Sequence, residues 1–253
     1  MVLTLDIGNT HIVLGGFLDG ELQFVSRLST NAKKTEDEYA ALLYDIFRLE
    51  GVHKPEVQGA IISSVVPPLN QTMTAALKKV CGITPMIVGP GIKSGVNLLV
   101  DNPQQVGADL VCSAAAVVKH YPLPALIVDM GTATKLSIID ENGAFRGVSI
   151  TPGVQMGLQA LSGGTAQLPQ VSLDAPKHLI GKNTVESMQS GVVYGNACLI
   201  DGMARRMEAE FGAPLSRIAT GGIAKFIIPQ CELDFTLDES LILKGLYSIY
   251  EKN

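Results

Sequence analysis

Apolar runs that end in an acidic, glycine-containing turn occur twice along this chain. The first, Val2–Leu5, leads into Asp6-Ile-Gly-Asn-Thr10 and is followed by apolar runs at His11–Leu18 and Leu22–Leu28. The second, Ala125–Val128, leads half a chain later into Asp129-Met-Gly-Thr-Ala-Thr134 and is followed by runs at Leu136–Ile139 and Phe145–Ile150. Each copy predicts three strands joined by turns. The repeat therefore predicts a duplicated protein of two lobes.

The rest of the pattern predicts helices between and after the two copies. Thr35 and Glu38 have the spacing of a capping box, which predicts that an amphipathic helix begins there and runs to Glu50. Further helices are predicted at Leu69–Cys81, Asp109–His120, Val154–Leu161, Thr184–Phe211 and Glu239–Tyr250, and further strands at Ala60–Val66 and Arg217–Thr220. Alternating strands and helices place the chain in the α/β class. We expect an N-terminal lobe at 1–118 and a C-terminal lobe at 119–253, with a ligand cleft between them.

Composition narrows the class of protein. The chain has 253 residues, 47% of them hydrophobic, which is enough for a large core, and its net charge of -5 comes from scattered acids. No run of Lys or Arg suggests a nucleic-acid-binding surface. The cysteines and histidines lack the spacing of a zinc site or of a disulfide framework. With no basic leader and no apolar stretch long enough for a bilayer, the sequence predicts a cytoplasmic protein that binds neither nucleic acid nor membrane.

The repeated acidic turn suggests phosphate chemistry. Gly8 has no Cβ, so the turn can bring backbone N–H groups close to a polyphosphate, and Asn9 and Thr10 add side-chain donors. A carboxylate beside phosphates would repel them unless a cation lay between, so Asp6 is interpreted as a ligand of Mg²⁺, direct or through water. The alternative is an Asx-type turn that merely ends a strand. The second copy at Asp129 weakens that alternative.

A third glycine turn follows the predicted strand Arg217–Thr220. Gly221 and Gly222 would let the backbone approach a nucleoside closely, although a Gly-Gly pair alone is more often just a turn. Two D-x-G-x-T-type turns followed by T-G-G resemble the nucleotide-binding set of the actin, heat-shock-protein and sugar kinase superfamily. The resemblance implies a duplicated ribonuclease H-like (actin-like) two-lobe fold with ATP in the cleft between the lobes.

Within that superfamily the sequence resembles type III pantothenate kinases from end to end. The segments that carry the resemblance, in the family's order and spacing, are Asp6–Thr10, Ser63–Pro67, Asn102–Pro103, Gly107–Asp109, Asp129–Ala133, Pro152–Gly153, Thr165–Pro169, Ile180–Thr184, Met188–Gly191 and Thr220–Gly222. The closing segment Leu241–Asn253 resembles the family's C-terminal helix. The resemblance implies an enzyme that phosphorylates the primary hydroxyl of pantothenate with ATP, the first step of coenzyme A synthesis.

The resemblance also implies roles for particular residues. Asp109, after Gly107 and Ala108 in a substrate-binding segment, is the expected general base; its alternative is an acid that favours the dipole of a first helical turn. ATP is expected at Asp6, Ile7, Gly8, Asn9, Thr10, Gly131, Thr132, Gly221 and Gly222. Asp129 is expected to bind an activating monovalent cation, K⁺ or NH₄⁺, in addition to the Mg²⁺ at Asp6. Thr184 is expected to contact pantothenate across a homodimer interface, to be the N-cap of the next helix, or both.

Three positions depart from the family's pattern. Leu110 stands where the family usually carries Arg, Val100 where it usually carries Tyr, and Lys135 where it often carries Thr. Leu110 cannot make the charge-assisted hydrogen bonds of an Arg, worth about 1.5–3 kcal/mol each. Lys135 either points to solvent from its strand or places its ammonium where the monovalent cation or a phosphate would lie.

These departures leave two alternatives to an active pantothenate kinase. One is a catalytically weakened, nucleotide-binding regulatory paralogue, and the other is a kinase of another small hydroxylated substrate. We rank the active kinase first, because a degenerate enzyme would be expected to lose its metal and base residues as well.

Overall fold

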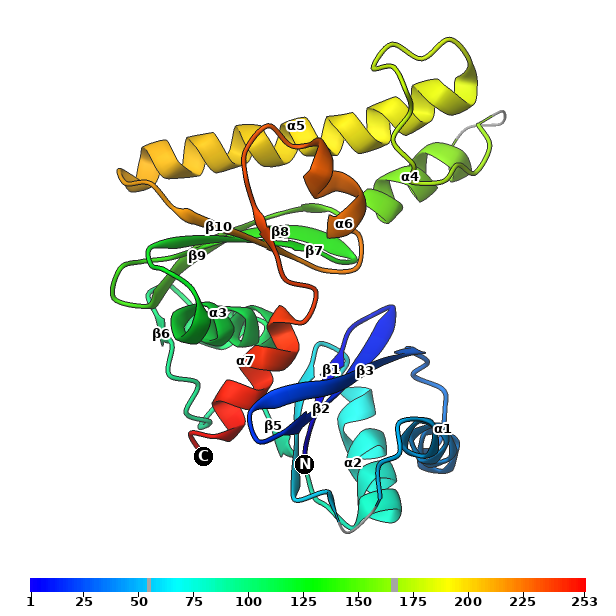
Figure 1. Ribbon diagram of the computed structural model, residues 1–253, viewed down its shortest axis with the longest axis vertical. Helices are drawn as coiled ribbons and strands as arrows, with labels where there is room; N and C mark the ends of the chain where they lie inside the picture. The colour runs from blue at the N-terminus through cyan, green and yellow to red at the C-terminus, as the bar shows by residue number, and fades with distance from the viewer. Residues whose placement is uncertain (54–55, 165–167) are drawn as a thin grey trace. The chain divides into compact units, whose positions relative to one another are not determined.

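The computed structural model describes residues 1–53, 56–164 and 168–253, which form two compact units. One unit comprises Met1–Val96, Asp101–His120 and Leu241–Asn253, and the other comprises Asn97–Val100 and Tyr121–Ser240 (Figure 1). This division corrects the predicted single boundary after residue 118, because the C-terminal helix packs on the sheet and on a helix of the first unit. Residues 165–167 of the segment Thr165–Pro169 lie outside the described residues.

The first unit is a sheet with helices on both faces. Its elements are β1 (Val2–Ile7), β2 (His11–Leu18), β3 (Glu21–Ser29), α1 (Glu36–Leu49), β4 (Gly59–Ser64), α2 (Pro68–Cys81), β5 (Met86–Ile87), η2 (Pro103–Gln105), α3 (Ala108–His120) and α7 (Leu241–Tyr250). The strand order is β3-β2-β1-β4-β5, with β1 antiparallel to β2 and parallel to β4. Side chains alternate across a strand, so Leu3, Leu5 and Ile7 enter a core with α1 and α2, while α7 and α3 pack on the other face of β1 and β4.

The predicted helix at Thr35 is confirmed, including its capping box. The Thr35 side chain accepts from the Glu38 backbone N–H at 3.4 Å, and the Glu38 carboxylate accepts from the Thr35 N–H at 2.8 Å. Such a cap stabilises a helix by about 1 kcal/mol. The larger contribution comes from the buried face, where Tyr39, Leu43 and Phe47 join the core of the first unit.

The second unit repeats the strand plan of the first. Its elements are β6 (Asn97–Leu98), β7 (Ala125–Met130), β8 (Ala133–Ile139), β9 (Ala144–Pro152), α4 (Val154–Gly163), α5 (Thr184–Phe211), β10 (Ser216–Thr220), α6 (Ala224–Ile227), η3 (Ile228–Gln230) and β11 (Thr236–Leu237). The strand order is β11-β10-β7-β8-β9-β6, with β7 antiparallel to β8 and parallel to β10. Thus β7, β8, β9 and β10 are arranged like β1, β2, β3 and β4. Asp6 and Asp129 are both the next-to-last residue of the first strand, which confirms the predicted duplication.

The long helix α5 lies across one face of the second sheet (Figure 1). Its bounds, Thr184–Phe211, agree with the prediction, but its N-cap is Asn183, whose side chain accepts from the Glu186 N–H at 2.9 Å. Thr184 as N-cap is therefore wrong, and Thr184 is the first helical residue. The inner face of α5 packs with α4 and α6 on the sheet through Val193, Ala197, Ile200 and Ala204, which are spaced three or four apart, and through the adjacent Val192.

Among the described residues, no helix has both the length and the apolar character needed to cross a bilayer.

Candidate active site

The first acidic turn connects β1 to β2. The Gly8 backbone N–H donates to the His11 carbonyl at 2.9 Å, and a Cβ on Gly8 would lie 3.1 Å from that same oxygen. The Thr30 hydroxyl donates to the Gly8 carbonyl at 2.6 Å, and the Thr30 N–H donates to the Thr10 carbonyl at 3.0 Å. Thr30, directly after β3, thus stabilises the turn through two hydrogen bonds, and the sequence pattern did not single this residue out.

The predicted ATP-binding residues of this turn have different exposures. Asn9 and Thr10 are exposed, Gly8 and Asp6 are half-buried, and Ile7 is fully buried in the core of the first unit. A ligand can therefore meet Asn9 and Thr10 through side chain or backbone, but it can meet Ile7 only through its backbone.

Asp109 is the second residue of α3, two residues after Gly107. One carboxylate oxygen of Asp109 accepts from the Leu110 N–H at 2.9 Å, and a Cβ on Gly107 would lie 2.4 Å from that oxygen. Gly107 is therefore needed for the Asp109 carboxylate to adopt this position. The Gly107 carbonyl accepts from the Val111 N–H at 3.2 Å, so the N-terminus of α3 starts here and its dipole favours a negative charge at Asp109.

The second acidic turn and the T-G-G turn meet at the end of β7. Gly221 has φ +95°, and a Cβ on it would lie 2.6 Å from the backbone of Met130. Gly153 approaches from the end of β9: its N–H donates to the Thr132 carbonyl at 3.2 Å, and its Cβ would lie 2.2 Å from that oxygen. The glycines permit close backbone packing here. Of the predicted residues, Gly131, Thr132 and Gly221 come together, and Gly222 follows Gly221 half-buried.

Gly153 belongs to this cluster although the sequence analysis gave it no role. The motif Pro152-Gly153 was visible, but its contact with Thr132 depends on the fold of β9 back along β8, which pairs Ala133 with Pro152. Only that strand pairing shows that position 153 has no room for a Cβ.

Asp129 forms a nearly buried ion pair with Lys135. The two residues are direct neighbours in the antiparallel pairing of β7 with β8, and Lys135 Nζ lies 2.7 Å from Asp129 Oδ2. Only 14% of the Lys135 side chain and 10% of the Asp129 side chain are exposed. The alternative in which Lys135 points to solvent is therefore wrong. Its ammonium lies against the carboxylate that was expected to bind a monovalent cation.

Leu110 and Val100 depart from the family's usual Arg and Tyr at positions expected to affect pantothenate binding. Leu110 is buried, 8% exposed, and Val100 is half-buried in a bend after β6. Neither side chain can donate a hydrogen bond.

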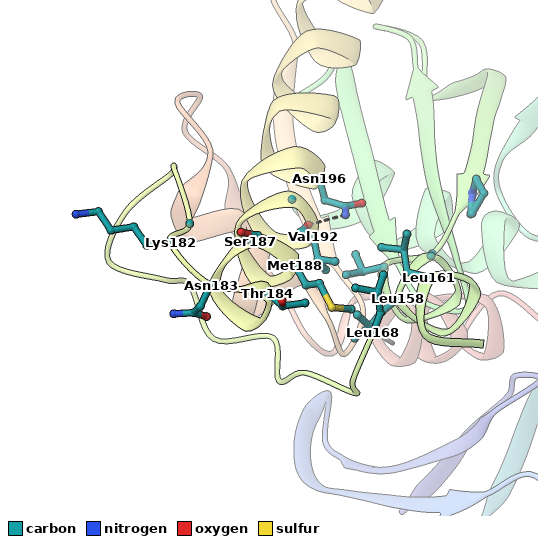
Figure 2. A pocket seen from close by; sticks show the side chains of 16 residues that line it. Leu158, Leu161, Leu168, Lys182, Asn183, Thr184, Ser187, Met188, Val192 and Asn196 are labelled. Atoms are coloured by element: carbon teal, nitrogen blue, oxygen red, sulfur yellow. Dashed lines mark hydrogen bonds between the residues drawn. The ribbon is translucent and has the colours of Figure 1, made fainter. Parts of the chain in front are cut away.

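A pocket of about 860 Å³ lies between α4 and the first half of α5 (Figure 2). Apolar side chains of both helices and of the connecting segment meet in it, among them Leu158, Leu161, Leu168 and Met188, while Lys182 and Asn183 point away from them. Thr184 is exposed at its rim. Gly153 also lines the pocket, which therefore begins beside the second acidic turn.

Comparisons with known proteins decide the family. The sequence profile of the family described as type III pantothenate kinase matches residues 2–206. A type III pantothenate kinase of Halalkalibacterium halodurans is 43% identical over 253 residues, covering all of both chains. This chain belongs to the type III pantothenate kinase family.

Solved structures agree with this family at the level of the fold. A putative Baf family transcriptional activator from Campylobacter jejuni matches with a TM-score of 0.61 and 22% identity, over 99% of this chain and 98% of that one. The activator of 2-hydroxyisocaproyl-CoA dehydratase from Clostridium difficile, solved with bound ADPNP, matches with a TM-score of 0.58 and 14% identity, over 99% and 94%. This chain therefore has the predicted duplicated, ribonuclease H-like (actin-like) two-lobe fold.

Proposed function

We propose that this protein is an active pantothenate kinase, which transfers the terminal phosphoryl group of ATP to the primary hydroxyl of pantothenate in the first step of coenzyme A synthesis. The observation that carries the proposal is the relative of the same family that matches the whole chain at 43% identity. Three acids are proposed for the chemistry: Asp109 to accept a proton, Asp6 to bind Mg²⁺ and Asp129 to hold a positive charge. A cytoplasmic location is part of the same proposal.

Asp109 is the proposed general base. Phosphoryl transfer depends mainly on positioning and charge neutralisation, together with an acceptor for the proton of the attacking hydroxyl. The Leu110 N–H donates to one carboxylate oxygen of Asp109 and so fixes the direction in which the carboxylate lies at the start of α3. Gly107 and Ala108 complete the proposed substrate segment, because Gly107 leaves the space that this carboxylate position needs.

ATP would be held by the two acidic turns and the T-G-G turn. In the first, Asn9 and Thr10 offer exposed donors; in the second, Gly131, Thr132, Gly221 and Gly222 offer closely packed backbone. Mg²⁺ prefers oxygen ligands and usually takes only one or two carboxylates together with phosphates and water. The carboxylate of Asp6 fits that pattern, and the described residues contain no cluster of three or more His, Cys, Asp or Glu side chains that would suggest a protein-enclosed metal. When bound, Mg²⁺ would neutralise developing phosphate charge.

Lys135 takes the place proposed for the monovalent cation. A K⁺ or NH₄⁺ ion at Asp129 would supply one positive charge beside the second phosphate turn, and the Lys135 ammonium supplies that charge through a covalent tether. The proposal is therefore that Asp129 holds Lys135 instead of a free cation, so that activity does not depend on added potassium or ammonium.

The acceptor side is proposed to be completed by a homodimer. Thr184 and Leu161 are exposed at the pocket between α4 and α5, and Ile180 and Val185, close to Thr184 in the sequence, are exposed as well. A second copy that covers this surface would bring Thr184 toward its partner's pantothenate. Because Leu110 and Val100 lack donors, such a contact would matter more for affinity in this chain.

An ADP-release assay with ATP, Mg²⁺ and pantothenate tests the proposal. Saturable turnover that is equal with and without potassium or ammonium is the expected result, and a panel of other small alcohols serves as the comparison. If the protein binds ATP but releases no ADP with pantothenate, the proposal is refuted. The remaining alternatives are then a kinase of another acceptor and a regulatory protein. Turnover that requires potassium would refute only the part concerning Lys135.

A further inference from the structure

Two small, fully buried polar residues lie beside the proposed catalytic carboxylates of the first unit. Ser63 on β4 is the direct neighbour of Asp6 in the parallel pairing of β1 with β4, so both side chains leave the same face of the sheet. Ser63 is 0% exposed, and among the described residues its hydroxyl has no hydrogen-bond partner apart from the thiol of Cys112, which is a weak one. A buried hydroxyl with only a weak partner is costly, so its presence requires an explanation.

Cys112 approaches the same place from α3. It lies three residues after Asp109, hence on the same side of the helix, and it is 0% exposed. The helix α7 packs closely against the backbone of Cys112, since a Cβ on Gly245 would lie 1.8 Å from the Cys112 carbonyl oxygen. Burial, above all, raises the pKa of the Cys112 thiol well above its ordinary value; the charge of Asp6 and, more weakly, that of Asp109 raise it further, while a hydrogen bond from Ser63 acts against them. Burial therefore keeps the thiol in its neutral form.

The duplicated fold shows what is unusual about Asp6. In the second unit the equivalent acid, Asp129, has Lys135 opposite it on the antiparallel strand and the buried Thr220 opposite it on the parallel strand. In the first unit the corresponding neighbours of Asp6 are Val13 and Ser63. Both units thus place a hydroxyl beside the acid, but the lysine is replaced by a valine beside Asp6.

Neutral donors suit a carboxylate that must bind a metal. A lysine or arginine beside Asp6 would compete with Mg²⁺ for the carboxylate, whereas a hydroxyl or thiol can donate to one oxygen and leave the charge in place. The Ser63 hydroxyl needs only a rotation about its Cα–Cβ bond to donate in this way, since the two residues already lie side by side on the sheet.

We propose that Ser63 and Cys112 are positioning residues: the Ser63 hydroxyl donates to the Asp6 carboxylate while Asp6 binds the metal of ATP, and Cys112 fills the space between Ser63 and Asp109 and so holds both acids in place. This proposal rests on the metal-binding role proposed for Asp6 and the base role proposed for Asp109. It assigns no chemistry to the thiol, which remains protonated.

Binding of Mn²⁺ in the presence of ADPNP, followed by the electron paramagnetic resonance of free Mn²⁺, tests the Ser63 part without turnover. Ser63→Ala should weaken Mn²⁺ binding about tenfold, a loss typical of a hydrogen bond to a charged group, and should lower kcat with less than about a twofold change in the KM for pantothenate. Ser63→Thr keeps the hydroxyl and should restore both. The matched control is Thr74→Val, which removes a buried hydroxyl without a hydrogen-bond partner on α2, away from Asp6.

Cys112 is tested by paired substitutions. Cys112→Val should lower kcat about tenfold because it adds bulk and removes the thiol, while Cys112→Ser should stay within about threefold of the unaltered protein. Cys81→Ala, which alters a buried thiol in the other core of the same unit, is the control and should keep full activity.

The outcomes separate this proposal from the one on which it rests. Unchanged Mn²⁺ affinity and kcat in a folded Ser63→Ala protein would overturn the role of Ser63, and equal kcat in Cys112→Val and Cys112→Ser would overturn that of Cys112. If Asp6→Asn itself left Mn²⁺ affinity unchanged, the metal-binding role of Asp6 would be the part that fails. Should Ser63→Ala not fold, Ser63→Cys, which replaces the hydroxyl by a weak donor, carries the same measurement.

Discussion

Replacing Lys135 by threonine should make the folded state depend on potassium. Lys135 Nζ lies 2.7 Å from Asp129 Oδ2, with 14% and 10% of the side chains exposed. Two unit charges at that separation attract by about 6 kcal/mol at an effective dielectric constant of about 20, and desolvation cancels part of this attraction. Removing the ammonium leaves a carboxylate in a site that holds a charge pair, so we expect a loss of about 3–5 kcal/mol in the free energy of unfolding. For a chain of this size the melting temperature would fall by roughly 6–20 °C.

The assay is thermal unfolding followed by circular dichroism in choline chloride, with potassium or ammonium chloride substituted at constant ionic strength. The unaltered protein should melt at nearly one temperature in all buffers. Lys135→Thr should melt lower in choline and recover as potassium binds the folded state, by about 1.4 kcal/mol when the ion is at ten times its Kd. Lys78→Thr, which alters an exposed lysine of α2, is the control for loss of charge alone.

A double variant separates the ion pair from the volume of the lysine. Asp129→Asn combined with Lys135→Met removes both charges. The double variant should lose less free energy of unfolding than the sum of the two single variants, because each single variant leaves a buried charge without its partner and the double variant does not. Melting of Lys135→Thr at the temperature of the unaltered protein, in the absence of potassium, would refute the reasoning. So would full additivity of the two changes.

Three further predictions concern other parts of the chain. Asp109→Asn should lower kcat by about 100-fold or more while ADP affinity in calorimetry changes less than about twofold; normal turnover would remove Asp109 from the base role. Gly221→Ala should lose about 1–3 kcal/mol in urea unfolding because of its φ of +95° and its contact with backbone, whereas Gly202→Ala, with open space around it, should be neutral or stabilising; equal effects would contradict this account. Alkylation at pH 8 should modify the exposed Cys198 well before Cys231, since burial, and then the charges of Asp201 and Cys198, raise the pKa of Cys231 to about 12 and so deplete its reactive thiolate; equal rates by mass spectrometry would count against it.

Local chemistry explains why most elements were predictable. The helix that starts after Thr35 carries its own start signal, and α5 has apolar residues at helical spacing along its length, so both lie where the sequence predicts them. The start of α5 shows the limit of such signals: Asn183 and Thr184 are both good N-cap residues, and only the backbone conformation at Asn183 shows which one caps.

Long-range packing accounts for what the sequence pattern missed. The helix α7 is the last element of the chain but packs on β1, β4 and α3 of the first unit, so a boundary drawn along the sequence assigned it to the wrong lobe. The contact of Gly153 with Thr132 was missed for the same reason, because it needs strand pairing between distant segments.

The sequence by itself determined the duplication, the α/β class, the resemblance to type III pantothenate kinases and the residues expected to do the chemistry, because turn glycines, strand-end acids and helix periodicity are local and repeat within one chain. Only the tertiary structure decided that Lys135 lies against Asp129, that Ser63 lies beside Asp6, and that Cys112 is fully buried. These facts depend on strand register and helix packing. A shift of one residue would turn each strand side chain to the opposite face of its sheet.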